Sequence, residues 1–119
     1  MNSKEVMEKV VRCMDSKKAS DIRVLDISSV TTMADYFVIC QGNSPAQMRA
    51  ISEEIEEKLA LDGVNPIGRE GMNTSYWILM DYSDVIVHVF SGESRSFYSI
   101  ENLWADASDV DISEIITED

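Results

Sequence analysis

The chain has 119 residues, 45% hydrophobic and 27% charged, which is enough to bury one core and is typical of a soluble globular domain. Its 22 acidic and 10 basic residues give a formal net charge of -12, which argues against sequence-specific nucleic-acid binding because such proteins cluster Lys and Arg. No segment has the length and apolarity of a membrane span, and the charged N-terminus is unlike a secretion signal, so a cytoplasmic protein is expected.

The first part of the chain predicts a helix followed by two strands. Apolar residues recur at intervals of three and four from about residue 3 to residue 17, as on one face of an amphipathic helix. The segment 21–28 alternates as a strand does, and the nearly continuous apolar run 35–41 is typical of a strand covered on both sides. The second strand should therefore lie deeper than the first.

A second helix is predicted from its start and stop signals. Ser44 is a favourable N-cap, Pro45 suits the first helical position, and Gln47 completes a capping box. The helix is expected to begin at Ser44 and to end at Asp62-Gly63.

The second half predicts a hairpin and a last helix. After a loop through Pro66 and Gly71, the strands 76–82 and 84–90 are joined so tightly at Ser83 that they should pair antiparallel, and a helix should begin near Ser94. The order of elements predicts one α/β or α+β domain over residues 1–107, with helices packed on a mixed sheet.

The C-terminal segment 108–119 is expected to be a flexible acidic tail. From Asp106 onward the chain holds six acidic residues and no basic one. Its apolar residues are nevertheless spaced so that they could form one amphipathic turn: Val110, Ile112, Ile115 and Ile116.

The cysteines and the single histidine do not predict a catalytic site. Cys13 and Cys40 fall on different predicted elements without a CxxC motif, so buried, reduced thiols are expected instead of a zinc site or a disulfide. His88 shares a strand face with Asp84, but four residues of strand separate them by roughly 13 Å at the usual rise. No nucleophile motif accompanies His88, which is interpreted as a hydrogen-bonded packing or interface residue.

Nucleotide chemistry is also disfavoured. The turn 42–44 could bind an anion through backbone N–H groups, but a helix cap is the favoured interpretation because neither a P-loop lysine nor GxGxxG is present. Nucleotidyl transfer needs two carboxylates on a strand to hold magnesium, and the Asp-x-Asp pair Asp109 and Asp111 lies in the tail. We therefore expect no enzyme activity, no cofactor and no metal site.

Aromatic residues gather in the last third of the domain: Tyr76, Trp77, Tyr82, Phe90, Phe97, Tyr98 and Trp104. Trp and Tyr are favoured anchors of protein interfaces. Packing of the sheet against the last helix explains any one of them equally well, but their number favours a surface for another protein.

Four blocks of the sequence resemble the ribosomal silencing factor family, also called Iojap-like, which the chain matches from about Val6 to Ala107. The blocks are ADYFVICQGNSPAQMRAISEEI (34–55), REG (69–71), WILMDYSDVIVHVF (77–90) and ESRSFYSIENLW (93–104). In this order they are highly specific together, although each is weak alone.

The resemblance implies a cytosolic factor that binds the large ribosomal subunit through large-subunit ribosomal protein fourteen. Such a factor blocks joining of the small subunit and lowers translation when nutrients are scarce. A role in large-subunit assembly is the alternative. The family fold is similar to a degenerate nucleotidyltransferase, and the family is not known for enzyme activity.

The resemblance also implies a contact surface made of Trp77, Leu79, Met80, Asp81, Tyr82, His88 and Tyr98. Trp77, Leu79 and Asp81 alternate onto one strand face, where an aromatic anchor, an aliphatic contact and a carboxylate suit a basic ribosomal protein. An exposed aromatic face also makes self-association of the free protein as a homodimer reasonable, although the sequence does not decide between monomer and dimer.

Two further expectations concern the ends of the last strand. Glu93, Arg95 and Glu101 should cap or pair around the last helix. At the hairpin, the family usually has Tyr-Gly-Asp where this chain has Ser83 in the middle position, so a positive φ there would strain the serine.

Overall fold

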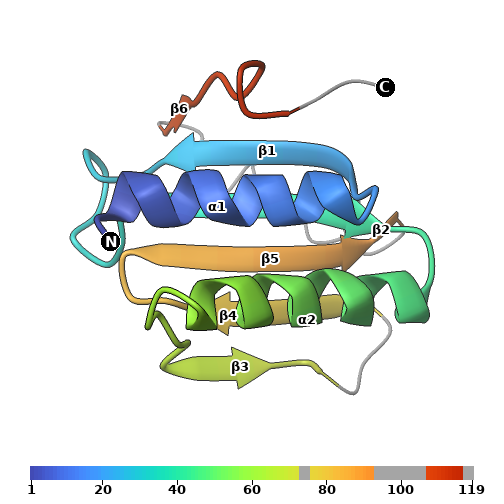
Figure 1. The fold of residues 1–119 in the computed structure, drawn as a ribbon. Coiled ribbons are helices and arrows are strands. Elements are labelled where there is room, and N and C mark those ends of the chain that lie inside the picture. Colours follow the sequence, from blue (N-terminus) through green and yellow to red (C-terminus); the bar gives the residue numbers. More distant parts are fainter. Residues whose placement is uncertain (73–75, 93–106, 117–119) are drawn as a thin grey trace.

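The computed structural model describes residues 1–72, 76–92 and 107–116, and within these ranges its centre is a 6-stranded sheet of order β3-β4-β5-β2-β1-β6 (Figure 1). The strands are β1 (Ser20–Asp26), β2 (Tyr36–Gly42), β3 (Gly68–Glu70), β4 (Trp77–Asp81), β5 (Val85–Ser91) and β6 (Ser108–Asp109). The central strands β2 and β5 are parallel, and the remaining neighbours are antiparallel. The prediction of a mixed sheet in an α+β domain, with β4 and β5 as a hairpin, is confirmed.

Helices α1 (Ser3–Ser16) and α2 (Pro45–Ala60) lie side by side on one face of this sheet (Figure 1). Helix α1 begins with a capping box in which Asn2 and Glu5 each accept the backbone N–H of the other. No helix in the described part of the chain is long and apolar enough to cross a bilayer.

The predicted start and end of α2 are both confirmed. Ser44 Oγ accepts the backbone N–H of Gln47 at 3.0 Å, and the Gln47 side chain accepts the backbone N–H of Asn43 at 2.6 Å. At the other end Gly63 has φ +75, and the N–H of Val64 returns to the carbonyl of Leu59 at 3.0 Å. These local hydrogen bonds explain why a few residues at each end are enough to determine where the helix begins and ends.

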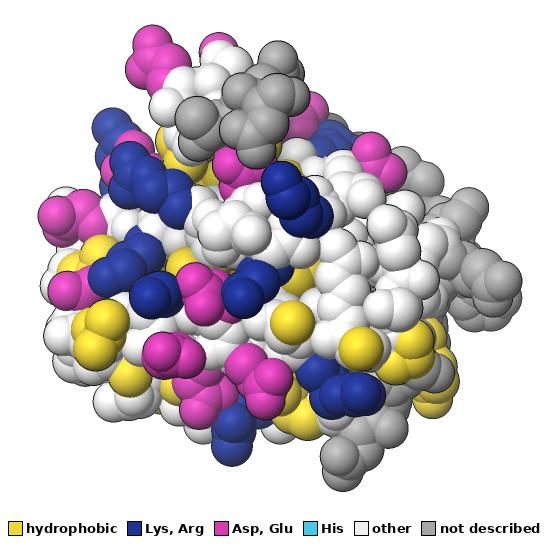
Figure 2. All heavy atoms as spheres, turned by 45° about the vertical axis from the view of Figure 1, so that its right-hand side comes forward, with side chains coloured by type: hydrophobic (Ala, Val, Ile, Leu, Met, Phe, Trp, Pro, Cys, Tyr) yellow, Lys and Arg dark blue, Asp and Glu magenta, His cyan; other side chains and the backbone are white. Residues whose placement is uncertain are grey.

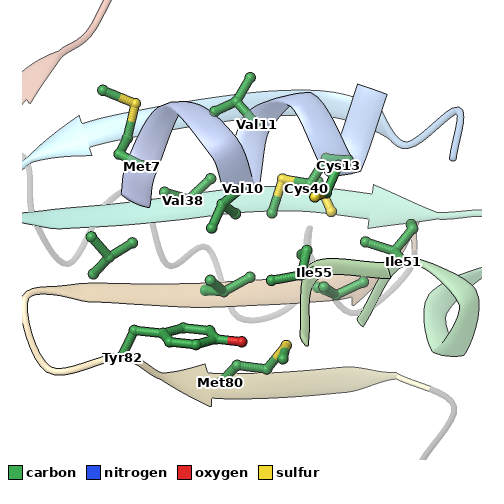
Figure 3. Packing of buried hydrophobic residues seen from close by; sticks show 14 of the residues in the cluster. Met7, Val10, Val11, Cys13, Val38, Cys40, Ile51, Ile55, Met80 and Tyr82 are labelled. Atoms are coloured by element: carbon green, nitrogen blue, oxygen red, sulfur yellow. The ribbon is translucent and has the colours of Figure 1, made fainter. Parts of the chain in front are cut away.

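The main core lies between the two helices and the sheet (Figure 3). It contains Met7, Val10, Val11 and Met14 of α1, Met48, Ile51, Ile55 and Leu59 of α2, and Val24, Val38, Ile78, Met80, Val85, Val87 and Val89 of the strands. Cys13 and Cys40 are buried in this core and are not joined in a disulfide, which confirms the prediction of buried, reduced thiols. Burial, with Glu54 adding to it, raises the pKa of Cys13 to about 11, so this thiol is protonated at neutral pH.

A second, smaller apolar cluster covers the opposite face of the sheet. It is formed by Leu25, Ile27, Ala34, Phe37, Ile39, Ile86 and Phe90, with Trp77, Leu79 and Ala107 partly buried against it. Strand β5 is buried on both faces from Val85 to Phe90, and β2 is buried from Phe37 to Cys40. The prediction that the apolar run 35–41 forms a strand covered on both faces is thus confirmed for β2.

The C-terminal segment differs from its prediction as a flexible tail. Strand β6 pairs antiparallel with β1, and Asp109 forms an ion pair with Arg23 at 2.7 Å. The N–H groups of Ile115 and Ile116 bond the carbonyl of Ile112 at 2.9 and 3.0 Å, forming the amphipathic turn that the sequence allowed. With Val110, these side chains pack against the main core, so apolar burial outweighs the solvation of the acids over residues 108–116.

The predicted last helix near Ser94 lies outside the described residues, as do Glu93, Arg95, Phe97, Tyr98, Glu101 and Trp104. Strand β3 was expected to be part of a loop. It is three residues long, all of them exposed, and it pairs with β4 at the edge of the sheet. Its existence depends on that pairing, because no apolar pattern marks it in the sequence.

The hairpin turn between β4 and β5 holds Ser83 at φ +72, in the left-handed region where a serine is strained. We expect Ser83→Gly to raise the free energy of unfolding by about 0.5–1 kcal/mol, since the relief of strain exceeds the entropy cost of glycine in the unfolded chain. Urea denaturation measures the change. The matched control is Gly63→Ala, at φ +75 with no atom within 4 Å of the added Cβ, which should be destabilising. A less stable Ser83→Gly protein would contradict this account.

Candidate functional site

Alternation along β4 divides the predicted contact residues between the two faces of the sheet. Trp77, Leu79 and Asp81 pair with Phe90, His88 and Ile86 of β5, and all six side chains lie on the face opposite the helices. Trp77, Leu79 and Asp81 are each partly exposed. The structure therefore brings four of the predicted residues onto one face of the sheet, with Trp77, Leu79 and Asp81 partly exposed and His88 buried beneath them.

Met80 and Tyr82 lie on the other face and do not join this surface. Both side chains are buried in the main core on the α2 side of the sheet, with Ile55 in the same cluster (Figure 3). Burial, followed by the nearby Glu56 carboxylate, raises the pKa of Tyr82 well above its usual range. The prediction that Met80 and Tyr82 share a contact surface with Trp77 needs correction, because side chains alternate along a strand and these two point to the opposite face. Tyr98 is outside the described residues, and its role stays a prediction.

His88 is packed in an aromatic cluster and is only 3% exposed. Its ring meets Phe37 edge-on at a centroid distance of 4.8 Å and lies parallel to Phe90 at 6.0 Å. The indole N–H of Trp77 donates to His88 Nδ1 at 3.2 Å. Trp77 also stacks on Phe90 at 5.1 Å. A hydrogen-bonded packing residue is what the sequence predicted here.

Burial lowers the pKa of His88 from its usual value of 6.5 to about 4, so the ring is neutral at pH 7. Because the folded pKa lies below the unfolded one, the unfolded chain binds more protons between pH 4 and 6.5. The stability contributed by neutral His88 is present above about pH 6.5 and is lost as the pH falls toward 4, by up to about 3 kcal/mol.

Comparing urea denaturation of the wild type with His88→Gln at several pH values isolates this effect from the titration of other groups. We expect the stability advantage of the wild type to shrink as the pH is lowered from 7 to 4. Parallel pH profiles for the two proteins would assign the acid sensitivity to other residues.

A cavity of about 360 Å³ opens beside His88 on this face. It is lined by Met33, Phe37, Gly68, Glu70, Leu79, Asp81, Ile86 and His88. Met33, which is 56% exposed, and Glu70 were not among the predicted contact residues. Glu70 stands in the REG block of the family resemblance, which was a usable signal, whereas Met33 lies in a loop without any pattern.

The cavity has an acidic rim. Glu70 and Asp81 are its charged lining residues, and no Lys or Arg of the described chain lines it. Neighbouring Arg69 pairs instead with Glu56 of α2 at 2.7 Å. One Asp81 oxygen accepts the backbone N–H of Ser83 at 2.8 Å, so this carboxylate also supports the hairpin turn. An apolar cavity with two carboxylates is suited to binding a basic, partly apolar partner.

The helix-bearing side of the molecule has a different character. Figure 2 shows Lys and Arg side chains intermixed with Asp and Glu there, with hydrophobic side chains scattered between them. Lys9 of α1 and Asp62 beyond α2 form one such ion pair. Mixed charge of this kind is typical of a solvated surface.

The turn 42–44 functions as a helix cap in this structure. The N–H groups of Asn43 and Gln47, which an anion would use, are already bonded to the side chains of Gln47 and Ser44. The Asp-x-Asp pair is remote from it, because Asp109 lies on β6 at the sheet edge and pairs with Arg23. The described residues thus bring together an apolar surface with two carboxylates and no reactive constellation.

Comparison with known proteins gives a consistent match. Residues 1–119 match the family model described as "Ribosomal silencing factor during starvation". The chain is 40% identical to the ribosomal silencing factor RsfS of Bacillus subtilis, over 94% of this chain and 95% of that protein. It is 30% identical to the chloroplastic protein Iojap of Zea mays, over 80% of this chain and 41% of that protein.

Solved structures have the same fold. A crystal structure of a protein from Chromobacterium violaceum has a TM-score of 0.85 at 32% identity, covering 88% of both chains. One from Bacillus halodurans has a TM-score of 0.82 at 33% identity, covering 92% of this chain and 99% of that one.

Proposed function

Because the chain belongs to the ribosomal silencing factor family, we propose that it binds the large ribosomal subunit through large-subunit ribosomal protein fourteen and sterically blocks joining of the small subunit. It would thereby repress translation in the cytoplasm under nutrient limitation. The family match over residues 1–119 is the observation that carries this proposal. The activity is regulation by binding, without a chemical step.

The outer face of β4 supports the proposal with a suitable surface. Trp77 and Leu79 are half-buried, so each is fixed by packing and still presents part of its side chain to a partner. Met33 adds exposed apolar area, and Glu70 and Asp81 add negative charge at the rim. Fixed aromatic and aliphatic groups bordered by charge are the usual composition of a binding hot spot, and the acids complement a basic ribosomal protein.

Occlusion makes a quantitative prediction about competition. If the protein and the small subunit need the same face of the large subunit, each lowers the apparent affinity of the other by mass action. Raising the concentration of small subunits should therefore restore joined ribosomes at a fixed concentration of this protein. Inhibition that stays constant over the titration would rule out a shared face.

Sedimentation with purified subunits tests the proposal directly. The protein is expected to travel with large subunits, not with small ones, and to reduce the joined-ribosome peak when both are present. Failure to bind either subunit would refute it. Binding to large subunits without any effect on joining would favour the alternative role in large-subunit assembly, for which accumulation of precursor particles in cells lacking the protein is the diagnostic.

A further inference from the structure

His88 has a ring nitrogen without a hydrogen-bond partner in the described part of the chain. An indole N–H can only donate, so the bond from Trp77 makes His88 Nδ1 an acceptor and places the proton of the neutral ring on Nε2. Within the described residues Nε2 is buried and has no hydrogen-bond partner. A buried donor without a partner is unfavourable, so an acceptor that reached this atom would gain more than one binding a solvated donor.

The cavity lies toward the Asp81 end of the β4–β5 pair, and Trp77 is not among its lining residues. Along the β4–β5 pair, Trp77 is opposite Phe90, whereas Asp81 is opposite Ile86, with His88 between them. The bond to Nδ1 comes from the Trp77 end, and the cavity extends from His88 toward Asp81 and Ile86. A group in the cavity therefore approaches His88 from the end of the strand pair opposite to Trp77.

The lining specifies the chemistry of the occupant. Glu70 and Asp81 at the rim repel an anion and attract a cation, while Phe37, Leu79 and Ile86 form apolar walls. Arginine fits this combination better than lysine, because its planar guanidinium is weakly hydrated, packs on aromatic and apolar surfaces and bonds carboxylates with several N–H groups. Since a guanidinium cannot accept a hydrogen bond, His88 Nε2–H needs a carbonyl oxygen from the same segment.

We propose that this cavity is a pocket for an arginine-bearing segment of a basic protein partner, with the guanidinium at Glu70 and Asp81 and a carbonyl oxygen accepting from His88 Nε2–H. The inference deepens the proposed function, on which it rests for the identity of the partner as a ribosomal protein. A second copy of this chain is a poorer occupant, because its net charge of -12 opposes approach to an acidic rim.

The pocket can be tested without ribosomes by titrating the ¹⁵N-labelled protein with N-acetyl-arginine amide and recording the His88 ring signals by NMR. N-acetyl-citrulline amide is the matched probe, because it keeps the size and the carbonyl groups but lacks the charge. The free protein should show the Nε2–H tautomer, and the arginine probe should shift that signal and the amides of Glu70 and Asp81 much more than citrulline does. The double variant Glu70→Gln, Asp81→Asn should bind the arginine probe about 3- to 10-fold more weakly than the wild type.

A companion measurement compares two His88 variants in binding to large ribosomal subunits. Asparagine at position 88 offers an acceptor near the place of Nδ1 but no donor at Nε2, whereas glutamine offers an amide N–H near Nε2. We expect His88→Asn to weaken binding by about 10-fold and His88→Gln to weaken it less. Circular dichroism and thermal unfolding confirm the fold of both, and Glu70→Gln, at an exposed position, tests the rim without disturbing the core.

The outcomes separate the two proposals. Absence of any His88 shift at about 50 mM arginine probe, far above the dissociation constant of about 1 mM expected for a small ligand, would overturn the pocket. Equal shifts with citrulline would overturn the role of the guanidinium. A wild type that binds the arginine probe but not large subunits would keep the pocket and refute the ribosomal function. If the wild type binds large subunits and the Glu70 and His88 variants bind them equally well, the ribosomal function stands and the pocket is refuted.

Discussion

A chain carrying both Trp77→Ala and Asp81→Asn is expected to bind the large ribosomal subunit at least about 100-fold more weakly than the wild type. Trp77 provides a partly exposed aromatic side chain on this face of the sheet, held in place by stacking on Phe90 and by its bond to His88. Asp81 provides negative charge on the same face, four residues further along the strand. Truncated tryptophans at interface centres are among the most costly substitutions for binding, and loss of a complementary charge adds to the effect.

The choice of asparagine keeps the double variant interpretable. Its side-chain oxygen can still accept the N–H of Ser83, so the charge is removed while the turn is preserved. Trp77→Ala removes packing against Phe90, and circular dichroism must confirm that the fold persists at the assay temperature. Tyr76→Ala is the matched control, because the adjacent aromatic residue is exposed but belongs to a different cavity, near the start of α2. Undiminished co-sedimentation of the double variant would exclude this face as the binding surface.

Two leucines near the end of α2 should differ greatly in their contribution to stability. Leu59 is 0% exposed in the main core and Leu61 is 75% exposed just beyond the helix. Leu59→Ala is expected to lower the free energy of unfolding by about 3–5 kcal/mol, since it removes apolar contacts and leaves a cavity under the helix. Leu61→Ala should change it by less than about 0.5 kcal/mol.

Chemical denaturation in guanidinium chloride gives both values from the same experiment, provided that the slopes of the transitions agree. A chain of this size has a total stability on the order of 5–15 kcal/mol, so Leu59→Ala should also be visible as a large drop in the thermal midpoint. Similar losses for the two leucines would mean that the burial of α2 against the sheet is misassigned.

The fold was largely predictable where local signals and side-chain periodicity agree. Ser44, Pro45 and Gln47 mark the start of α2, and Ser44 accepts the backbone N–H of Gln47 as expected. The Gln47 side chain accepts the N–H of Asn43, one residue before the N–H that a capping box would use. The hairpin of β4 and β5 follows from two apolar runs joined by a tight turn. In both cases residues close in sequence make the decisive contacts, so the sequence alone contains the information.

Elements that depend on distant pairing were not predictable in this way. Strand β3 has an exposed three-residue sequence without alternation, and β6 exists because Leu25 and Asp26 of β1 offer it a free edge. Sequence patterns record which side chains are apolar, but not which strand edge remains available after the sheet has formed.

The candidate site was predicted in part for the same reason. Alternation correctly placed Trp77, Leu79 and Asp81 together, and the same rule places Met80 on the opposite face, where the family motif had suggested a contact. The cavity beside His88 could be found only from the structure, because Met33 comes from a loop and Glu70 from the edge strand. Neither residue is near His88 in the sequence.

The parallel pairing of β2 with β5 has a consequence for how the chain reaches its native state. Partners across this pair, such as Tyr36 and Val85, are 49 positions apart, and α2, β3 and β4 lie between them in the sequence. During synthesis, the central pair of strands therefore cannot form until β5 has left the ribosome. Over that interval the apolar segment Phe37–Cys40 lacks its β5 neighbour along one edge, so slow completion of the chain would expose an unpaired apolar strand to aggregation.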